Sequence, residues 1–161
     1  MNFISQSIIF VAYIVFFMYI STYYGARFVL CKTVYKYTID IRPKAKQSTR
    51  FTSAKNHQCY TDHKILKWTK EFRAKLINNL HKRWKPLKQK VSIKYEFIFK
   101  NAKQKTWGKY KDTSPDIDNL CKAANDAIKG ILIDDDKYIV SQQAIKLYSK
   151  EDCICIELEL L

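Results

Sequence analysis

Apolar residues recur along the chain at two different spacings, which predicts a mixture of strands and helices. In segments 34–41, 91–99 and 153–160 apolar and polar side chains alternate, as they do on a strand with one buried face. A further strand is expected over 138–148 and a short one over 131–133. The alternating segments therefore predict a small β-sheet.

Two segments between these strands have helical spacing. From residue 63 to residue 84, apolar side chains return every three or four positions, and lysine and arginine occupy the opposite face. The second helix is expected over 115–129, with Ser114 as the N-cap and Gly130 ending it. We therefore predict an α+β domain, in which two main helices pack on a small mixed β-sheet.

The first 26 residues differ from the rest because they contain no charged side chain. The unbroken apolar run over 8–20 is short for a membrane span. A helix over 3–24 would measure about 33 Å, however, enough to cross a hydrocarbon core of ~30 Å. Three interpretations stay open: a membrane anchor, an extension that is not native, and a buried helix or signal sequence.

Two parts are therefore expected: a hydrophobic segment over 1–33 and a globular domain over 34–161. The first basic residues follow the apolar run, so insertion would tether the domain to the cytoplasmic face of a membrane. Without insertion, the expected location is the cytoplasm.

Charge is distributed unevenly on a chain with a formal net charge of +14. Residues 27–111 carry 24 Lys/Arg against 4 Asp/Glu, whereas residues 112–161 carry 5 against 11. The basic part suits a polyanion, but an acidic island within it would repel phosphates unless a divalent cation reverses its sign. Nucleic acid together with Mg²⁺ is therefore the leading class of partner. The five cysteines have no Cys-x-x-Cys spacing and argue against a zinc site.

The carboxylates of this acidic part form two tight groups, Asp116 with Asp118 and the triplet over 134–136. Close carboxylates repel each other by about 4 kcal/mol at an effective dielectric constant of ~20, so such groups face open water or hold a metal. The alternative is structural: Asp116 and Asp118 would be favourable charges at a helix N-terminus, Lys122 an i,i+4 partner, and the triplet a hydrated turn.

Both groups belong to a longer series of spaced residues. It runs Pro115-Asp116-Ile117-Asp118-Asn119-Leu120-Cys121-Lys122-Ala123-Ala124, then Asp126-Ala127, Asp135-Asp136, Tyr138-Ile139-Val140 and Lys146. This series resembles the signature of the RusA-type Holliday-junction resolvases, which are small Mg²⁺-dependent endonucleases common in phages and prophages. The resemblance implies that the domain over 34–161 is a RusA-like endonuclease domain and that it works in the cytoplasm of a bacterial or phage-infected cell. The resemblance is strong from Ser114 to Glu159, weaker from Tyr35 to Tyr60, and absent over 1–33.

The resemblance implies roles for individual residues. Asp116, Asp118 and Asp136 would be the catalytic, metal-binding carboxylates, Lys122 the catalytic-site lysine, and Asp135 a supporting ligand. Mg²⁺ is the expected cofactor, with Mn²⁺ as a substitute. Because the first two acids lie at a helix start and Asp136 near a strand end, folding is expected to bring them together. The additional acid Asp134 departs from the pattern, so the register is taken from Ile139-Val140.

The predicted function is Mg²⁺-dependent resolution of Holliday junctions by paired, symmetric nicking in DNA recombination and repair. Family members act as homodimers, so a homodimer on branched DNA is expected. Phosphate and base contacts are expected from two basic loops, at Lys44, Lys46, Arg50, Lys103, Lys105, Trp107, Lys109 and Lys111. Trp107 would either stack on an unpaired base or pack on its own domain.

Two other functions stay open at this point. One is a non-catalytic, membrane-tethered DNA-binding protein that contacts the membrane through residues 3–24. The other is a metal-dependent nuclease that also cuts flaps or plain duplex.

Overall fold

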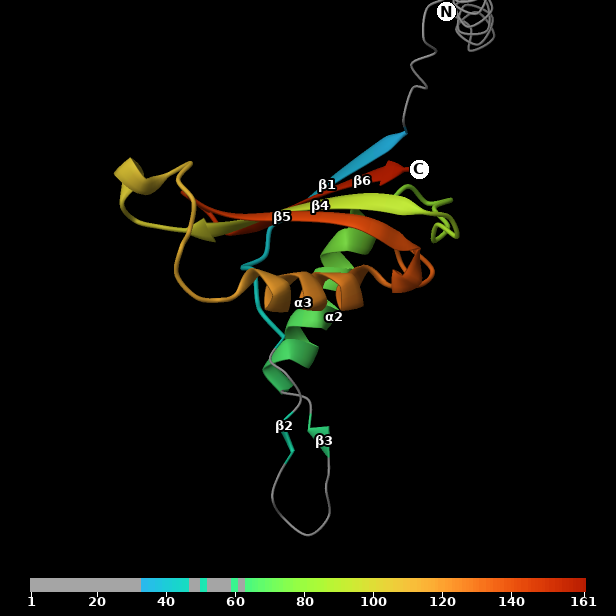
Figure 1. The fold of residues 1–161 in the computed structure, drawn as a ribbon, viewed down its shortest axis with the longest axis horizontal. Helices are drawn as coiled ribbons and strands as arrows, with labels where there is room; N and C mark the ends of the chain where they lie inside the picture. Colours follow the sequence, from blue (N-terminus) through green and yellow to red (C-terminus); the bar gives the residue numbers. More distant parts are fainter. Residues whose placement is uncertain (1–32, 47–49, 52–58, 61–62) are drawn as a thin grey trace, which may run out of the picture. The chain divides into compact units, whose positions relative to one another are not determined.

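The computed structural model describes residues 33–46, 50–51, 59–60 and 63–161 (Figure 1). The hydrophobic segment and its three interpretations thus lie outside the described residues, apart from Thr33 at its end. Within the described ranges, neither helix is sufficiently long and apolar to cross a membrane.

A four-stranded mixed sheet forms the centre of the fold (Figure 1). Its strands are β1 (Val34–Ile39), β4 (Val91–Lys100), β5 (Ile139–Ser149) and β6 (Cys153–Leu160), and they lie in the order β1-β6-β4-β5. The pairing of β4 with β5 is parallel, while β6 pairs antiparallel with both β4 and β1. The mixed sheet predicted from the alternating segments is confirmed.

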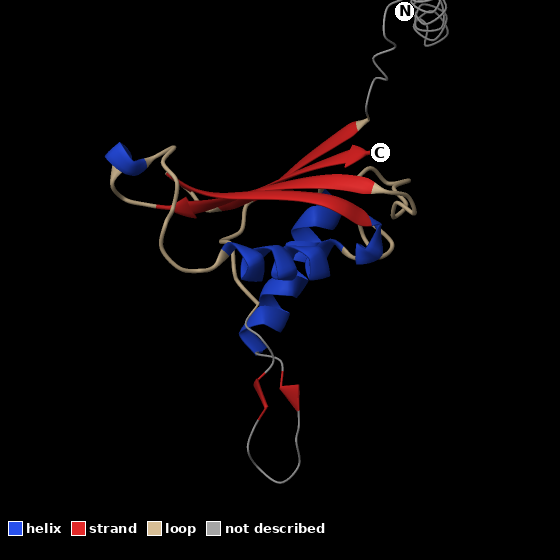
Figure 2. Ribbon diagram, viewed as in Figure 1, coloured by secondary structure: helices blue, strands red, loops and turns tan. Residues whose placement is uncertain are grey.

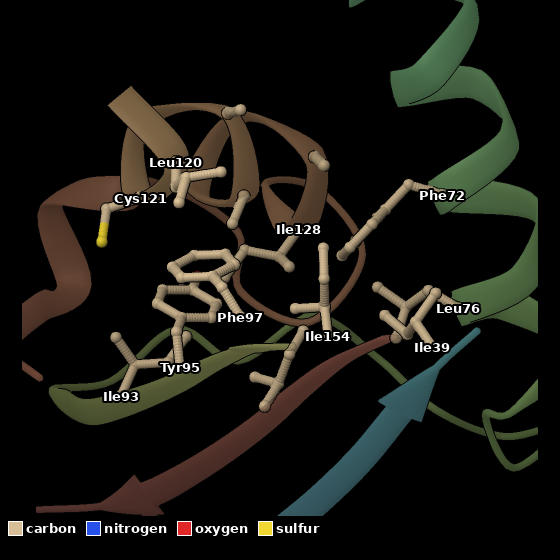
Figure 3. Close-up of a cluster of buried hydrophobic side chains, with 14 of the residues drawn as sticks. Ile39, Phe72, Leu76, Ile93, Tyr95, Phe97, Leu120, Cys121, Ile128 and Ile154 are labelled. Carbon is tan, nitrogen blue, oxygen red and sulfur yellow. The ribbon is translucent and has the colours of Figure 1, made fainter. Parts of the chain in front are cut away.

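Two helices, α2 (His63–Asn78) and α3 (Ile117–Ile128), cover one face of this sheet (Figure 2). Every second side chain of β4, from Val91 to Phe99, is buried beneath them, as are Ile154, Ile156 and Leu158 of β6. Phe72 and Leu76 of α2 meet this apolar layer (Figure 3). The core therefore lies between the helices and the sheet, as the predicted α+β class requires.

The end of α2 differs from the prediction, because the helix stops at Asn78 rather than at residue 84. Asn78 and Asn79 have low helix propensity, and the exposed Asn79 side chain donates to the Thr38 carbonyl of β1 at 2.9 Å. Trp84 still packs against the core from the following loop. Helical spacing thus continued past the end of the helix.

The predicted strand over 131–133 is also wrong. These residues form turns in which Ile133 makes isolated bridges to Leu87 and Lys129. Within the first basic loop, β2 (Arg50–Phe51) and β3 (Cys59–Tyr60) form an antiparallel pair. Two short 3₁₀ helices, η1 (Gln104–Thr106) and η2 (Asp136–Tyr138), complete the described elements.

Candidate active site

The N-terminal end of α3 carries the first pair of acids. The helix begins at Ile117, and Asp116 is its N-cap residue, so the predicted N-cap at Ser114 lies two positions too early. The backbone of Asp116 is extended, with φ of −69° and ψ of 143°, so the helix cannot include the residues before it. The Pro115 carbonyl accepts a hydrogen bond from Lys146 Nζ at 2.9 Å rather than from the helix. The carboxylate of Asp116 makes no capping hydrogen bond.

Asp118 lies in the first turn of α3 and contacts Lys122 one turn later. The Lys122 Nζ to Asp118 Oδ2 distance is 3.1 Å, and both side chains are exposed. The hydrogen bond from the ammonium lowers the pKa of Asp118 below its usual value. This carboxylate therefore remains ionised at a pH below the usual range.

The second pair of acids lies beyond the C-terminal end of α3. Lys129 follows the helix, and its ammonium lies 2.9 Å from Asp135 Oδ2 and 2.9 Å from Asp136 Oδ1. Asp135 also accepts a hydrogen bond from the backbone N–H of Lys137 at 3.0 Å. These contacts, the lysine first, lower the pKa of Asp135 from 3.8 to about 2, and the two carboxylates raise the pKa of Lys129.

Asp134 has separate contacts. Its side chain lies 3.8 Å from Lys88, and its backbone N–H donates to the Leu87 carbonyl at 2.9 Å. The Lys129 contact is therefore shared by Asp135 and Asp136, the two acids selected by the register chosen from the sequence.

The two acid pairs lie at opposite ends of α3. Asp118 and Lys129 are eleven positions apart, which at 1.5 Å per residue is roughly 16 Å along the helix. Contrary to the expectation from their sequence positions, one chain does not bring Asp116 and Asp118 beside Asp136. Over the described residues, no three acidic, histidine or cysteine side chains gather closely enough to hold a metal ion. The metal-binding role of the four acids stays a prediction.

Arg73 of α2 fixes the C-terminal end of α3. Its guanidinium donates to three carbonyls that the helix leaves without an intrahelical partner, those of Asp126 at 3.0 Å, Ala127 at 3.1 Å and Lys129 at 2.8 Å. On the sheet side, Asn125 accepts from the buried Tyr95 hydroxyl at 2.8 Å and donates to Gln142 of β5 at 2.9 Å. These contacts hold α3 at a defined position on the sheet.

Lys146 of β5 is a positioning residue that the sequence-based site did not include. Its ammonium donates to the carbonyls of Thr113 and Pro115, both at 2.9 Å. The segment leading into Asp116 is thereby tied to the sheet. The signal was present in the sequence, because Lys146 closes the series of spaced residues described above.

The first basic loop approaches α3. The backbone N–H of Lys46 donates to the Asn119 carbonyl at 3.0 Å, and its ammonium lies 2.5 Å from Asp126 Oδ2. Lys44 donates to the Lys64 carbonyl at 3.0 Å. For Arg50 the structure describes the backbone alone, so its predicted DNA contact lies outside the described side chains.

The second basic loop, residues 101–113, runs along the edge of β5. Lys109 and Lys111 exchange backbone hydrogen bonds with β5, and the Lys111 ammonium lies over the rings of Phe99 and Tyr148. The other lysines of this loop, Lys103 and Lys105, are exposed, as is Lys109. The loop therefore offers positive charge to solvent from a fixed backbone.

The aromatic residues of this loop differ in exposure. The indole N–H of Trp107 donates to the Asn101 carbonyl at 2.8 Å, and its ring is half-buried. Tyr110 is 75% exposed, and its backbone pairs with Leu147 of β5. The contacts of Trp107 favour packing on its own domain, and Tyr110 is an exposed aromatic side chain that sequence reasoning missed.

A family model described as Endodeoxyribonuclease RusA matches residues 40–159. The chain belongs to the RusA endodeoxyribonuclease family. The matched span includes both acid pairs, Lys122, Lys129 and Lys146. Membership identifies the protein as an enzyme, a phosphodiester hydrolase that cuts within DNA and acts on Holliday junctions. Among curated proteins, no match to the chain was found.

Proposed function

We propose that this RusA-family protein resolves four-way DNA junctions by paired, symmetric, Mg²⁺-dependent nicking. The observation that carries the proposal is the exposed pair Asp116 and Asp118 at the start of α3, within a span matched by an endodeoxyribonuclease family. Mg²⁺ in proteins is typically bound by one or two carboxylates, with water and substrate phosphates completing its shell. These donors therefore fit Mg²⁺, and they accept Mn²⁺ for the same reason.

Each residue of this pair has a distinct part in the proposal. Asp116 and Asp118 hold the cation, which when bound activates a water and neutralises charge on the phosphate. Lys122 orients the Asp118 carboxylate through its 3.1 Å contact, and its exposed ammonium is available to the scissile phosphate. Lys146 keeps the approach to Asp116 in place.

A homodimer explains why the acids of one chain are separated. Two copies related by a twofold axis, with their α3 helices antiparallel, would place Asp135 and Asp136 of one copy near Asp116 and Asp118 of the other. Such a dimer holds two equivalent sites, as paired nicking requires. Each site would then draw carboxylates from both chains.

DNA binding is proposed for the second basic loop. Lys103, Lys105 and Lys109 are exposed and suit phosphate contacts that carry no sequence information. Tyr110 is the proposed stacking residue for an unpaired base at the junction, in place of Trp107, because its ring is exposed while its backbone is paired with β5. Lys44 and Lys46 of the first loop bind phosphate once the Asp126 contact of Lys46 opens.

Single-turnover cleavage of a labelled four-way junction and of a linear duplex of equal length tests the proposal. Paired nicks on the junction are expected with Mg²⁺, and none with EDTA or with Asp118→Asn. Glu151→Gln, which removes an exposed carboxylate in the turn between β5 and β6, is the matched control and should cut normally.

Two outcomes would contradict the proposal. Equal cutting of duplex and junction would indicate a nuclease of broader preference. Tight junction binding without cleavage in Mg²⁺ or Mn²⁺ would show that the acid pairs are structural.

A further inference from the structure

The ammonium of Lys129 occupies the position that a cation shared by Asp135 and Asp136 would take. It lies 2.9 Å from an oxygen of each carboxylate. At the other end of α3, Lys122 contacts Asp118 alone. The Asp116 carboxylate forms no hydrogen bond or ion pair with any described residue, although the Asp116 backbone carbonyl accepts from Leu120. The two acid pairs thus differ in whether a protein cation already bridges them.

Backbone hydrogen bonds hold Lys129 in position for this contact. Its N–H donates to the Asn125 carbonyl at 3.1 Å, and its carbonyl accepts from Arg73 at 2.8 Å. Gly130 follows with φ of 76°, a left-handed conformation that favours glycine, and donates to the Ile133 carbonyl at 2.7 Å. This turn returns the chain toward the helix end and places Asp135 and Asp136 within reach of the lysine.

An ammonium and a divalent cation cannot share the same carboxylate oxygens, because like charges at this separation repel strongly. Binding of a divalent cation at Asp136 therefore requires the ammonium to leave. When DNA binds, one of its phosphates can pair with the Lys129 ammonium in place of the two carboxylates.

We propose that Lys129 is an internal competitor for the divalent cation, which keeps the Asp135–Asp136 pair free of metal until DNA binds. The inference rests on the proposed function, since it requires metal binding at Asp136. Lys129 is then a positioning residue for metal loading, and it lowers the metal affinity of the DNA-free protein.

The test is Mn²⁺ binding to the full chain without DNA, measured from the electron paramagnetic resonance signal of free Mn²⁺. Lys129→Met should bind Mn²⁺ on the order of tenfold more tightly than wild type, because one nearby positive charge is removed. Lys129→Arg, which keeps the charge, should resemble wild type. Adding Asp136→Asn to Lys129→Met should abolish the gain.

Lys137→Met is the matched control. Lys137 lies in the same short turn, but its ammonium lies over the Tyr138 ring, 5.3 Å from the ring centroid. The variant loses the same unit of charge and should leave Mn²⁺ affinity nearly unchanged. Far-ultraviolet circular dichroism checks folding, and Lys129→Gln carries the same expectation should Lys129→Met unfold.

The outcomes separate this inference from the proposed function. Wild-type Mn²⁺ binding that is unchanged in Lys129→Met and Lys129→Gln overturns the inference alone. An equal gain in Mn²⁺ affinity in Lys137→Met also overturns the inference, because the loss of any nearby positive charge would then account for the tighter binding. If neither wild type nor any variant binds Mn²⁺, the inference and the metal dependence of the proposed function both fail.

Discussion

A pair of acids lies near each end of helix α3, and the two pairs differ in their contacts with the rest of the protein. At the N-terminal end, Asp118 has one exposed lysine contact and Asp116 is open to solvent. At the other end, Asp135 and Asp136 share Lys129. Two pairs of the same residue type are thus held in different environments. The difference indicates that an acidic motif specifies candidate ligands but not their availability, which the surrounding turns decide.

The largest expected effect tests whether the two ends work together across a dimer. Asp118→Asn and Asp136→Asn should each reduce junction cleavage on the order of a thousandfold. If each site draws acids from both chains, a mixture of the two inactive variants contains heterodimers with one intact site. Random pairing of equal amounts predicts nicking of roughly a quarter of wild type, as single rather than paired nicks.

Subunit exchange can be promoted by co-expressing the two variants. A mixture as inactive as its parents, with heterodimers demonstrated by mass spectrometry, would place each complete site within one chain. The comparison between the two ends would then lose its functional meaning.

Substitution of Lys122 tests the role of the lysine contact at the N-terminal end of α3. Lys122→Met should slow junction cleavage roughly 10- to 100-fold, because Asp118 loses the group that orients it. The measurement is the single-turnover rate at saturating Mg²⁺. Lys150→Met, in the exposed turn after β5, is the charge-matched control. A rate unchanged by Lys122→Met would show that this lysine has no part in cleavage.

Arg73→Ala should affect the C-terminal end of α3 selectively. Loss of three hydrogen bonds to backbone carbonyls is expected to lower the free energy of unfolding by about 2 kcal/mol, measured with urea. Hydrogen exchange should accelerate over 128–133 more than over 117–121. Lys70→Ala, an exposed lysine on the same helix, should change neither quantity. Uniform acceleration along α3 would contradict a local role for Arg73.

Substitution of Tyr110 tests DNA binding separately from cleavage, because it leaves both acid pairs intact. Tyr110→Ala should weaken junction binding by about 1–3 kcal/mol, and Tyr110→Phe should preserve it, because stacking requires the ring and not the hydroxyl. Fluorescence anisotropy at fixed salt measures both. Equal binding by Tyr110→Ala and wild type would remove the tyrosine from the interface.

The smallest expected effect is on the pH dependence of stability. Because Lys129 depresses the pKa of Asp135 from 3.8 to about 2, the folded state gains stability that is complete above the unfolded value and is lost as pH falls toward 2. The melting temperature of wild type should therefore fall more steeply between pH 5 and pH 2 than that of Lys129→Met. Parallel curves for the two proteins would show that the contact contributes nothing measurable.

Much of the fold could be predicted because the alternating pattern of each strand is present in its own consecutive residues. Alternation along β4 and β6 depends on the two-residue period of a strand, and each strand has one face in the core. The end of α2 was harder to predict, because apolar residues keep a helical spacing beyond the residue at which the helix stops. Trp84 fits the helical period of α2 yet packs from a loop, because Asn79 bonds to the end of β1.

The sequence alone determined the four strands of the main sheet, the two helices, the uneven charge and the family signature, since each depends on neighbouring residues or on a spaced series of residue types. Tertiary structure decided the features that depend on contacts between distant segments. Examples are the hydrogen bond from Lys146 to the Pro115 carbonyl ahead of α3, and the separation of Asp118 from Asp136 by the length of α3. The bridging of Asp135 and Asp136 by Lys129 is of the same kind, because it requires the Gly130 turn to reverse the chain. No local spacing encodes these contacts, because their geometry exists only once the helices have packed on the sheet.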